Sequence, residues 1–372
     1  MKIALVSPYD YAYPGGVVNH ICHLYDQFIM MGHIVKIITP CSDEKACLGS
    51  QDIITLGRPF PVPSGGSIAR ATLSPALSSP VRAILERERF DIIHIHEPLG
   101  STLPLTILRV SQSVNVGTFH ACHREPRGYQ MMKPFVIKWF NKLDGKIAVS
   151  TPAMEFISKH FPGDYRIIPN GIDVEHFSAE VSPIEGLCDG KLNILFVGRL
   201  EKRKGLRYLL GAYKEVRREI PNSRLIVVGP GARQEYENLI SKASLEDVVF
   251  TGYVSNEELP RYYKTADLFC APATGGESFG IVLLEAMAAA KPIVASHIDG
   301  YASVMSHGVE GLLVPPKDEQ ALASAIIHLL GDRSIRQEMG SRGRQKVELY
   351  KWQNIARRVV EYYTSLLDGS HL

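Results

Sequence analysis

The sequence predicts an α/β protein of two doubly wound, Rossmann-like domains that face each other across a cleft. Its 372 residues are enough for two domains of ordinary size, each with its own core. Short apolar runs alternate with helical patterns along the chain, and the alternation starts afresh near residue 192. Glycine-rich or basic turns follow these runs in both halves, and such turns lie at the ligand-binding edge of a parallel sheet.

The first half opens with a strand–helix–strand unit, which implies parallel strands. Residues 2–7 form an apolar strand, and apolar residues then recur at helical spacing from 17 to 31. Gly32 ends this helix, and the next strand covers 34–38. Further strands are expected at 53–56, 91–96, 115–118 and 146–149.

The second half repeats the pattern. A strand at 192–197 leads into a basic loop and a helix at 208–219. Later strands are expected at 224–228, 248–250, 268–270, 293–295 and 311–314.

The boundary between the halves is expected in a loop rich in proline, glycine and acids, 169–190. A last helix at 352–367 has no strand after it, so we expect it to cross back onto the first domain. The predicted divisions are an N-terminal domain at 1–172, a C-terminal domain at 173–351 and the returning segment 352–372.

Composition narrows the class of protein. Hydrophobic residues make up 45% and charged residues 22%, as in soluble globular proteins, and the net charge of +2 argues against nucleic acid as a partner. The first apolar stretch ends at Pro8, too short for a signal peptide, and no segment reaches the length of a membrane span. The six cysteines form no Cys-x-x-Cys pair. We therefore expect free thiols in a reducing cytoplasm.

The most informative motif is the stretch 275–286. Gly275 and Gly276 precede Glu277, and an apolar helical run then carries Glu285. Glycines let backbone N–H groups approach a ligand, and a helix start favours phosphate. An ordinary helix start with one acid explains part of this pattern, but the two glycines and two acids together favour a site for a sugar nucleotide.

Other turns add groups suited to a diphosphate. Arg199 and Lys204 flank a tight loop at 198–205, from which a guanidinium fork and a point charge can stabilise a departing diphosphate. Gly15 and Gly16 follow the first strand, a weak signal because any tight turn uses such a pair. The expectation is that these groups converge on one diphosphate.

Histidines follow the strands of the first half. His120 comes directly after a strand, where it can accept a hydrogen bond from a sugar hydroxyl; a structural role is the alternative. His94 and His96 alternate with isoleucines, so they share one strand face. Cys122 and His123 lie nearby without a second ligand cluster, so no metal site is expected.

Taken together, these motifs resemble the retaining glycosyltransferases of family four, which have the two-domain GT-B fold. The 275–286 stretch looks like the family's E-x7-E motif, 198–205 resembles its diphosphate-binding loop, and 169–173 resembles its interdomain linker. The resemblance covers nearly the whole chain and is strongest to members that mannosylate phosphatidylinositol.

The resemblance implies roles for individual residues. The catalytic set is His120, Glu277, Arg199 and Lys204. The donor-binding set is Gly15, Gly16, Gly198, Gly229, Val254, Gly275, Gly276, Ser278, Phe279, Gly280, Ile281 and Glu285. The acceptor-binding set is Tyr9, Asn19 and Arg70. No metal or cofactor is implied.

The implied reaction moves a hexose, mannose from GDP-mannose foremost, to phosphatidylinositol or a related inositol-type acceptor with retention of configuration. Three alternatives stay open: UDP-GlcNAc transfer to inositol phosphate or malate, a sugar-nucleotide epimerase, and a non-catalytic sugar-nucleotide-binding protein. Asn256 and Leu259 stand where the lipid mannosyltransferases carry an acid and a lysine, which leaves GDP against UDP open.

Lipid contact is expected at the inner face of the plasma membrane. The family's basic lipid-binding helix corresponds to 79–88, which mixes signs here. A substitute is the stripe 129–143, where apolar residues share one helical face beside lysines. A helix that faces the core is the alternative interpretation of this stripe.

Overall fold

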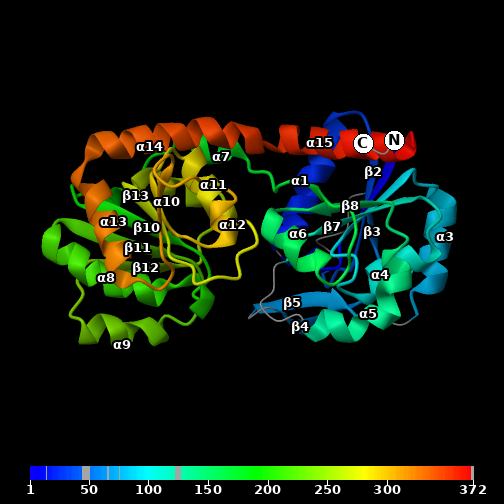
Figure 1. Ribbon diagram of the computed structural model, residues 1–372, viewed down its shortest axis with the longest axis horizontal. Helices are drawn as coiled ribbons and strands as arrows, with labels where there is room; N and C mark the ends of the chain where they lie inside the picture. The colour runs from blue at the N-terminus through cyan, green and yellow to red at the C-terminus, as the bar shows by residue number, and fades with distance from the viewer. Residues whose placement is uncertain (14, 44–50, 65–66, 75, 122–126, 370–372) are drawn as a thin grey trace. The chain divides into compact units, whose positions relative to one another are not determined.

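A computed structural model describes residues 1–13, 15–43, 51–64, 67–74, 76–121 and 127–369 (Figure 1). The chain divides into two compact units, each with its own parallel sheet. Unit 1 comprises Met1–Gly171 together with Trp352–Leu372, and unit 2 comprises Ile172–Lys351. The two parallel-sheet α/β units confirm the predicted fold class.

Unit 1 contains a seven-stranded sheet in the order β3-β2-β1-β6-β7-β8-β9, and all neighbouring strands are parallel. Its strands are β1 (Lys2–Val6), β2 (Ile34–Thr39), β3 (Ile53–Thr55), β6 (Ile92–His96), β7 (Val114–Phe119), β8 (Gly145–Ala148) and β9 (Arg166–Ile167). The strand order reverses between β1 and β6, and open sheets of this kind bind ligands at the carboxyl ends of the strands beside that point.

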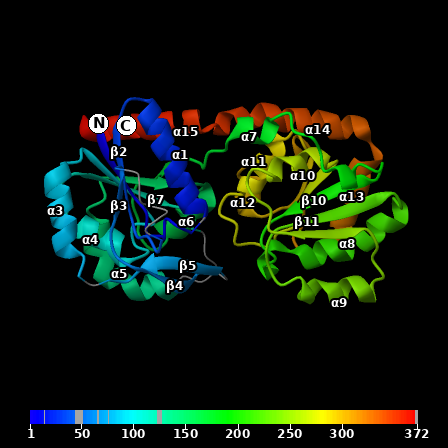
Figure 2. The same ribbon diagram turned by 180° about the vertical axis from the view of Figure 1, so that it is seen from behind.

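Helices cover both faces of this sheet (Figures 1 and 2). One apolar core lies under α1 (Gly16–Met30) and α15 (Trp352–Leu367). The core on the other face includes residues of α3 (Ser78–Glu88), α4 (Thr102–Val110), α5 (Arg127–Phe140) and α6 (Thr151–Ser158).

The returning helix α15 belongs to the core of unit 1. Trp352, Ile355, Val359 and Tyr363 are buried at its helical spacing and pack with residues of β1 and α1. Gly171 lets the chain pass close to this helix, because a Cβ there would lie 2.4 Å from the Trp352 ring. Residues near the C-terminal end of the chain therefore complete the core that lies against β1 and α1.

A two-stranded antiparallel sheet accompanies unit 1 and has no counterpart among the predicted strands. It pairs β4 (Pro59–Ser64) with β5 (Ser67–Thr72), and Tyr9 bridges to Ala71 beside it. Prolines at 59, 61 and 63 remove backbone donors along β4. Prolines argue against a strand in a pattern-based prediction, so β4 was not expected. They are tolerated because β4 pairs on one side only, with β5.

Unit 2 contains a six-stranded parallel sheet in the order β12-β11-β10-β13-β14-β15. Its strands are β10 (Leu192–Val197), β11 (Ser223–Val228), β12 (Val248–Gly252), β13 (Leu268–Ala271), β14 (Ile293–Ser296) and β15 (Gly311–Val314). The core on one face includes α7 (Val174–Ser178), α10 (Leu259–Thr265), α11 (Ile281–Ala288) and α12 (Asp299–Ala302). The other includes α8 (Leu206–Glu219), α9 (Gln234–Lys242), α13 (Glu319–Gly331) and α14 (Arg333–Lys346).

The segment expected as a loop after residue 171 is built into unit 2. Asp173 caps α7 by accepting a hydrogen bond from the His176 N–H, and Val174 and Phe177 are buried in the core. Ile172 also bridges to Lys351 in parallel register. Local capping and two buried side chains explain why this proline- and glycine-rich segment folds as part of the unit.

The apolar stripe at 129–143 faces the core more than solvent. Val136, Phe140 and Leu143 are buried within unit 1, whereas Phe135 is 76% exposed. The side chains of Met131 and Met132 lie outside the described residues. The expectation of an interfacial helix is therefore wrong for these three buried residues, because the stripe covers the sheet. Across the described ranges, no helix is both long and apolar enough to span a membrane.

Candidate functional site

Glu277 of unit 2, in the loop between β13 and α11, is paired with two cations. Its Oε1 lies 2.8 Å from Lys204 Nζ and 2.5 Å from Arg203 Nη1. The Glu277 and Lys204 side chains are only 12% and 16% exposed, so water screens the pair weakly. Glu277 thus precedes the helix instead of starting it, and two cations hold its carboxylate in place.

Close backbone packing brings the basic loop to Glu277. Lys202–Lys204 forms a short 3₁₀ helix, and Gly205 follows it with φ 75°. A Cβ at Gly205 would lie 1.9 Å from the Pro272 carbonyl oxygen, so only glycine allows this approach. Thr274 N–H also donates to the Arg203 carbonyl at 2.8 Å. The two loops after β10 and β13 are therefore joined by backbone as well as by charge.

The predicted glycines of unit 2 line these loops. Gly275, Gly276 and Gly280 have φ of 131°, 75° and 106°, a region that side chains disfavour. Gly229 approaches Gly198, whose carbonyl oxygen would lie 2.1 Å from an added Cβ. The glycines thus serve backbone turns and close packing: a Cβ at Gly280, the residue before α11, would lie 2.7 Å from the Tyr301 ring.

Other predicted donor-binding residues of unit 2 differ in exposure. Arg199 is exposed, while Val254, Ser278 and Ile281 are half-buried. Phe279 is buried in the apolar core beside Tyr350, with ring centroids 6.0 Å apart. The Phe279 side chain is therefore a core residue, and only its backbone is available to a ligand.

Glu285 lies on α11, and one oxygen of its carboxylate is hydrogen-bonded to a tyrosine. Its Oε2 accepts a hydrogen bond from the Tyr263 hydroxyl at 2.7 Å. Burial raises the pKa of Glu285 above its usual value, and the Tyr263 hydrogen bond and the Lys204 charge oppose this. A carboxylate so anchored can present its other oxygen to a neutral hydroxyl donor.

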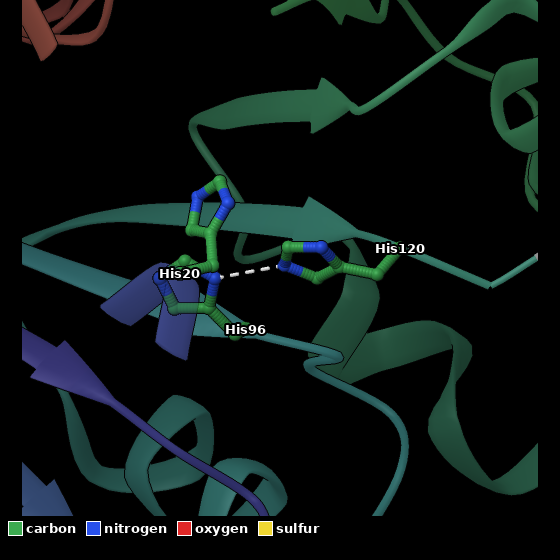
Figure 3. Close-up of side chains that lie close together, drawn as sticks. All are labelled: His20, His96 and His120. Carbon is green, nitrogen blue, oxygen red and sulfur yellow. Dashed lines mark hydrogen bonds between the residues drawn. The ribbon is translucent and has the colours of Figure 1, made fainter. Parts of the chain in front are cut away.

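In unit 1, imidazoles from separate elements gather at the carboxyl ends of the strands (Figure 3). His20 comes from α1, His96 ends β6 and His120 follows β7. His96 Nδ1 lies 3.0 Å from His120 Nε2, and His20 Nδ1 lies 2.9 Å from Asn170 Oδ1. The predicted active-site histidine is therefore one member of a cluster.

A fourth imidazole lies beneath this cluster. The His94 and His96 ring centroids are 4.3 Å apart. His94 Nε2 lies 2.6 Å from Thr118 Oγ1, and its Nδ1 lies 2.5 Å from the Tyr363 hydroxyl of α15. Both nitrogens of His94 are thus engaged, so its ring cannot turn freely.

Burial keeps these rings neutral. Desolvation lowers the pKa of His20 to about 4 and that of His94 to about 3. The pKa values of His96 and His120 are lowered well below the usual value, again chiefly by burial, with neighbouring histidines adding to the effect. At pH 7 the cluster consists of neutral donors and acceptors.

Glu97 is a buried acid beside the cluster. Its Oε1 accepts hydrogen bonds from the backbone N–H groups of His120 (2.7 Å) and Ala121 (2.9 Å). Burial raises the pKa of Glu97 to about 7 against these two bonds. The pKa of the Tyr9 hydroxyl is also raised, first by burial and then by the Glu97 charge.

The residues predicted for the acceptor lie on neighbouring loops. Arg70 accepts the Asp10 N–H at its backbone carbonyl, 2.9 Å away, and its guanidinium lies 4.3 Å from the centroid of the Tyr13 ring. The Tyr9–Ala71 bridge brings Tyr9 to the same strand. The structure therefore brings Tyr9 and Arg70 together, whereas Asn19 is exposed on α1.

Gly15 and Gly16 leave open space at the start of α1. A Cβ at Gly15 would approach only the Tyr13 carbonyl, at 4.0 Å, and one at Gly16 would meet nothing within 4 Å. Gly15 has φ −164°, which any residue adopts. Backbone geometry does not require glycine here, and added Cβ atoms would meet no close neighbour.

The cluster also contains the described residues best suited to hold a metal ion. One nitrogen from each of His20, His96 and His120 lies within 4.8 Å of the others. Two of these nitrogens already lie at hydrogen-bond distance from each other, so a metal would have to displace the proton they share. Cys122 and His123 lie outside the described residues.

Several residues of these sites were missing from the prediction. Arg203 lay inside a basic run without a signal that separated it from Lys204. His20, Glu97 and Asn170 reach their places only through the fold, from α1, the end of β6 and the end of unit 1. For His96, the alternation with isoleucines was a usable signal.

Comparison with known proteins gives one consistent family. The family described as "Glycosyltransferase Family 4" matches residues 14–176, and "Glycosyl transferases group 1" matches residues 178–346. The chain is 34% identical over 369 residues to phosphatidyl-myo-inositol mannosyltransferase of Mycobacterium leprae, covering 98% of this chain and 97% of the relative. The Propionibacterium freudenreichii protein of the same name is 31% identical, covering 98% and 95%.

A solved structure shows the same fold. Anabaena Alr3699/HepE, crystallised in complex with UDP, superposes with a TM-score of 0.79 at 20% identity, covering 98% of this chain and all of that one. At this identity the likeness concerns the fold alone.

Proposed function

The chain belongs to glycosyltransferase family 4 and has the GT-B fold, and from this premise we propose that it transfers mannose from GDP-mannose to phosphatidylinositol or a closely related inositol-type acceptor. The observation that carries the proposal is the pair of cations on Glu277, Lys204 at 2.8 Å and Arg203 at 2.5 Å. Named relatives at up to 34% identity over nearly the whole length support the mannosyl and inositol assignments.

The proposed reaction retains the anomeric configuration. The bond between the sugar C1 and the diphosphate oxygen breaks, and the acceptor oxygen bonds to C1 from the same face. The acceptor proton passes to the leaving phosphate oxygen. Because Glu277 itself is held by two cations, we do not invoke the two-carboxylate scheme of glycosidases.

Each group has a task in this scheme. Arg199 and Lys204 bind the diphosphate and stabilise its developing charge. Glu277 holds the sugar hydroxyls and keeps Lys204 in place before the donor arrives. We propose that no metal or cofactor takes part, because the cations of the basic loop 198–205 supply the positive charge that a metal would bring.

Glu285 is proposed to hold the ribose of the donor. Its Oε2 is engaged with Tyr263 at 2.7 Å, which leaves Oε1 for a hydroxyl. His120 is proposed to contact the sugar, and Tyr9 and Arg70 to contact the inositol-type acceptor.

A donor and acceptor panel tests the proposal. Purified protein would be incubated with GDP-mannose or UDP-GlcNAc, and with vesicles of phosphatidylinositol, soluble inositol phosphate or malate. Mass spectrometry is expected to show one hexose added to phosphatidylinositol with GDP-mannose, and far less of this product with the Glu277→Gln variant. Hexosamine transfer from UDP-GlcNAc, or donor conversion without acceptor, would instead establish one of the alternative reactions.

The alternative UDP-sugar donor is suggested by one residue, Asn256. Asn256 is exposed on the loop after β12, and its backbone carbonyl oxygen lies 2.8 Å from His176 Nε2. An amide reads the guanine N–H edge less decisively than an acid does. Thermal stabilisation by GDP but not by UDP, measured by scanning fluorimetry, is the result expected for the mannose reaction.

We also propose peripheral contact with anionic lipid on the cytoplasmic side, through the outer face of α5. Phe135 is 76% exposed there, with Lys133 and Lys138 on the same helix. Flotation with phosphatidylinositol vesicles should weaken in Phe135→Ser but not in Tyr253→Ser, an equally exposed aromatic of unit 2. Equal binding by both variants would contradict this contact.

A further inference from the structure

The two ring nitrogens of His96 differ in their hydrogen bonding. His96 is completely buried, and its Nδ1 lies 3.0 Å from His120 Nε2. Its Nε2 is buried and has no hydrogen-bond partner in the described part of the chain. Where the single ring proton of His96 lies therefore decides how His120 is protonated.

Only one placement of the proton avoids a buried, unpaired N–H group. With the proton on Nε2, the His96 N–H would be unpaired, at a cost of about 1–3 kcal/mol. With the proton on Nδ1, His96 donates to His120, and the unpaired position is a bare lone pair. Since a neutral histidine carries one proton, His120 then accepts at Nε2 and carries its own proton on Nδ1.

Asn170 engages the neighbouring ring of the cluster. Its Oδ1 lies 2.9 Å from His20 Nδ1 and accepts a hydrogen bond from it when that nitrogen carries the proton.

We propose that His96 is a positioning residue that holds His120 in the Nδ1–H tautomer, so that His120 donates a hydrogen bond to an oxygen of the bound substrate. This inference rests on the proposed glycosyl transfer for the identity of that substrate. It reverses the direction expected from the sequence, in which His120 accepts a hydrogen bond from a sugar hydroxyl.

The layer beneath His96 fixes its ring. The His94 ring lies against it with a centroid distance of 4.3 Å. Thr118 and Tyr363 engage the two nitrogens of His94 at 2.6 and 2.5 Å. The tautomer of His120 is thus set by a stack that reaches from β7 to α15.

The tautomer of His120 can be tested by NMR spectroscopy without measuring enzyme activity. Long-range ¹H–¹⁵N spectra of the full chain with ¹⁵N-labelled histidine would be recorded at pH 7.5, with His120→Asn to assign the signals. The expected result is a protonated Nδ1 and an unprotonated Nε2 in His120. A protonated Nε2 in His120 would overturn the proposal.

A kinetic test separates positioning from fold. His96→Leu removes the donor, and kcat should fall roughly tenfold to a hundredfold while the KM for the donor changes little. His96→Asn keeps an amide near the Nδ1 position and should restore most of the activity. His33→Asn, on the same unit, is the control. Unchanged kcat in His96→Leu would contradict the proposal, and the spectra of the wild type stand even if that variant fails to fold.

Two further outcomes are distinguishable. One equivalent of zinc in the purified chain, lost in His96→Asn, would mean that the rings hold a metal instead of a shared proton, and the proposal would fail. The expected His120 signals in a chain that transfers no sugar to any acceptor would leave the tautomer intact and refute the proposed function instead.

Discussion

Glu277 shows how much of the proposed donor site depends on single contacts. Its carboxylate holds Lys204 and Arg203 at 2.8 and 2.5 Å, largely out of water. Removing the charge while keeping the shape frees both cations and, in the proposed reaction, removes one sugar contact. In the proposed reaction, Glu277 therefore couples the geometry of the basic loop to the sugar.

We predict that Glu277→Gln lowers kcat by roughly a hundredfold or more, as for the loss of a preorganised polar group in an active site. Initial rates with the donor and acceptor found in the panel measure it. Glu258→Gln is the matched control, because this glutamate pairs with Arg261 on the surface of the same unit. Comparable rates in the two variants would refute the role of Glu277.

Gly205 offers a second test at the residue scale. Gly205 and Gly252 have nearly the same φ, 75° and 73°. A Cβ at Gly205 would lie 1.9 Å from the Pro272 oxygen, whereas at Gly252 nothing lies within 4 Å. Gly252→Ala should cost only backbone strain, about 1 kcal/mol, and Gly205→Ala clearly more. Urea unfolding of both variants decides this, and equal losses would show that the close approach does not matter.

At the scale of elements, α15 and the hairpin β4–β5 illustrate opposite cases. The bounds predicted for the last helix, 352–367, are those observed for Trp352–Leu367. The apolar residues of α15 recur at a clear helical period, so neighbouring residues in the sequence are enough to predict this helix. The hairpin carries three prolines and lies outside the parallel sheet, so no period identified it.

The buried hydroxyl of α15 gives a prediction at this scale. Tyr363→Phe keeps the ring but leaves His94 Nδ1 without the partner that lies 2.5 Å away. We expect the free energy of unfolding to fall by about 1–2 kcal/mol, measured by urea denaturation. Glu361→Gln, exposed on the same helix, should be neutral. A neutral Tyr363→Phe would show that His94 needs no second partner.

At the scale of the whole molecule, unit 1 should be sensitive to acid. The lowered pKa values of His20 (about 4) and His94 (about 3) mean that the unfolded chain binds more protons than the folded one below pH 6.5. Stability from these rings is fully present above pH 6.5 and is lost as pH falls toward 4. Hydrogen exchange should therefore show unit 1 opening before unit 2 between pH 6.5 and 4.5, whereas equal protection in both units would contradict this.

Glu97 acts in the opposite direction. Its pKa of about 7 in the fold, against 4.5 ordinarily, means that its burial costs stability that grows as pH rises from about 4.5 to 7. Glu97→Gln removes this term, so its unfolding free energy should fall more steeply on acidification than that of the wild type. Parallel urea titrations at pH 7.5, 6.0 and 4.5 test the slope, and a shallower slope in the variant would refute the assignment.

The sequence by itself determined the alternation of strands and helices, the family and the motif that we propose to bind the donor, because each depends on residues that are close together in the chain. Glu277 and Glu285 are eight positions apart, and the loop of Arg199 and Lys204 is contiguous. The tertiary structure alone decided which cations hold Glu277 and which imidazoles surround His120. His20, His96 and Asn170 are far apart along the chain, and burial, a property of the folded molecule, sets their protonation.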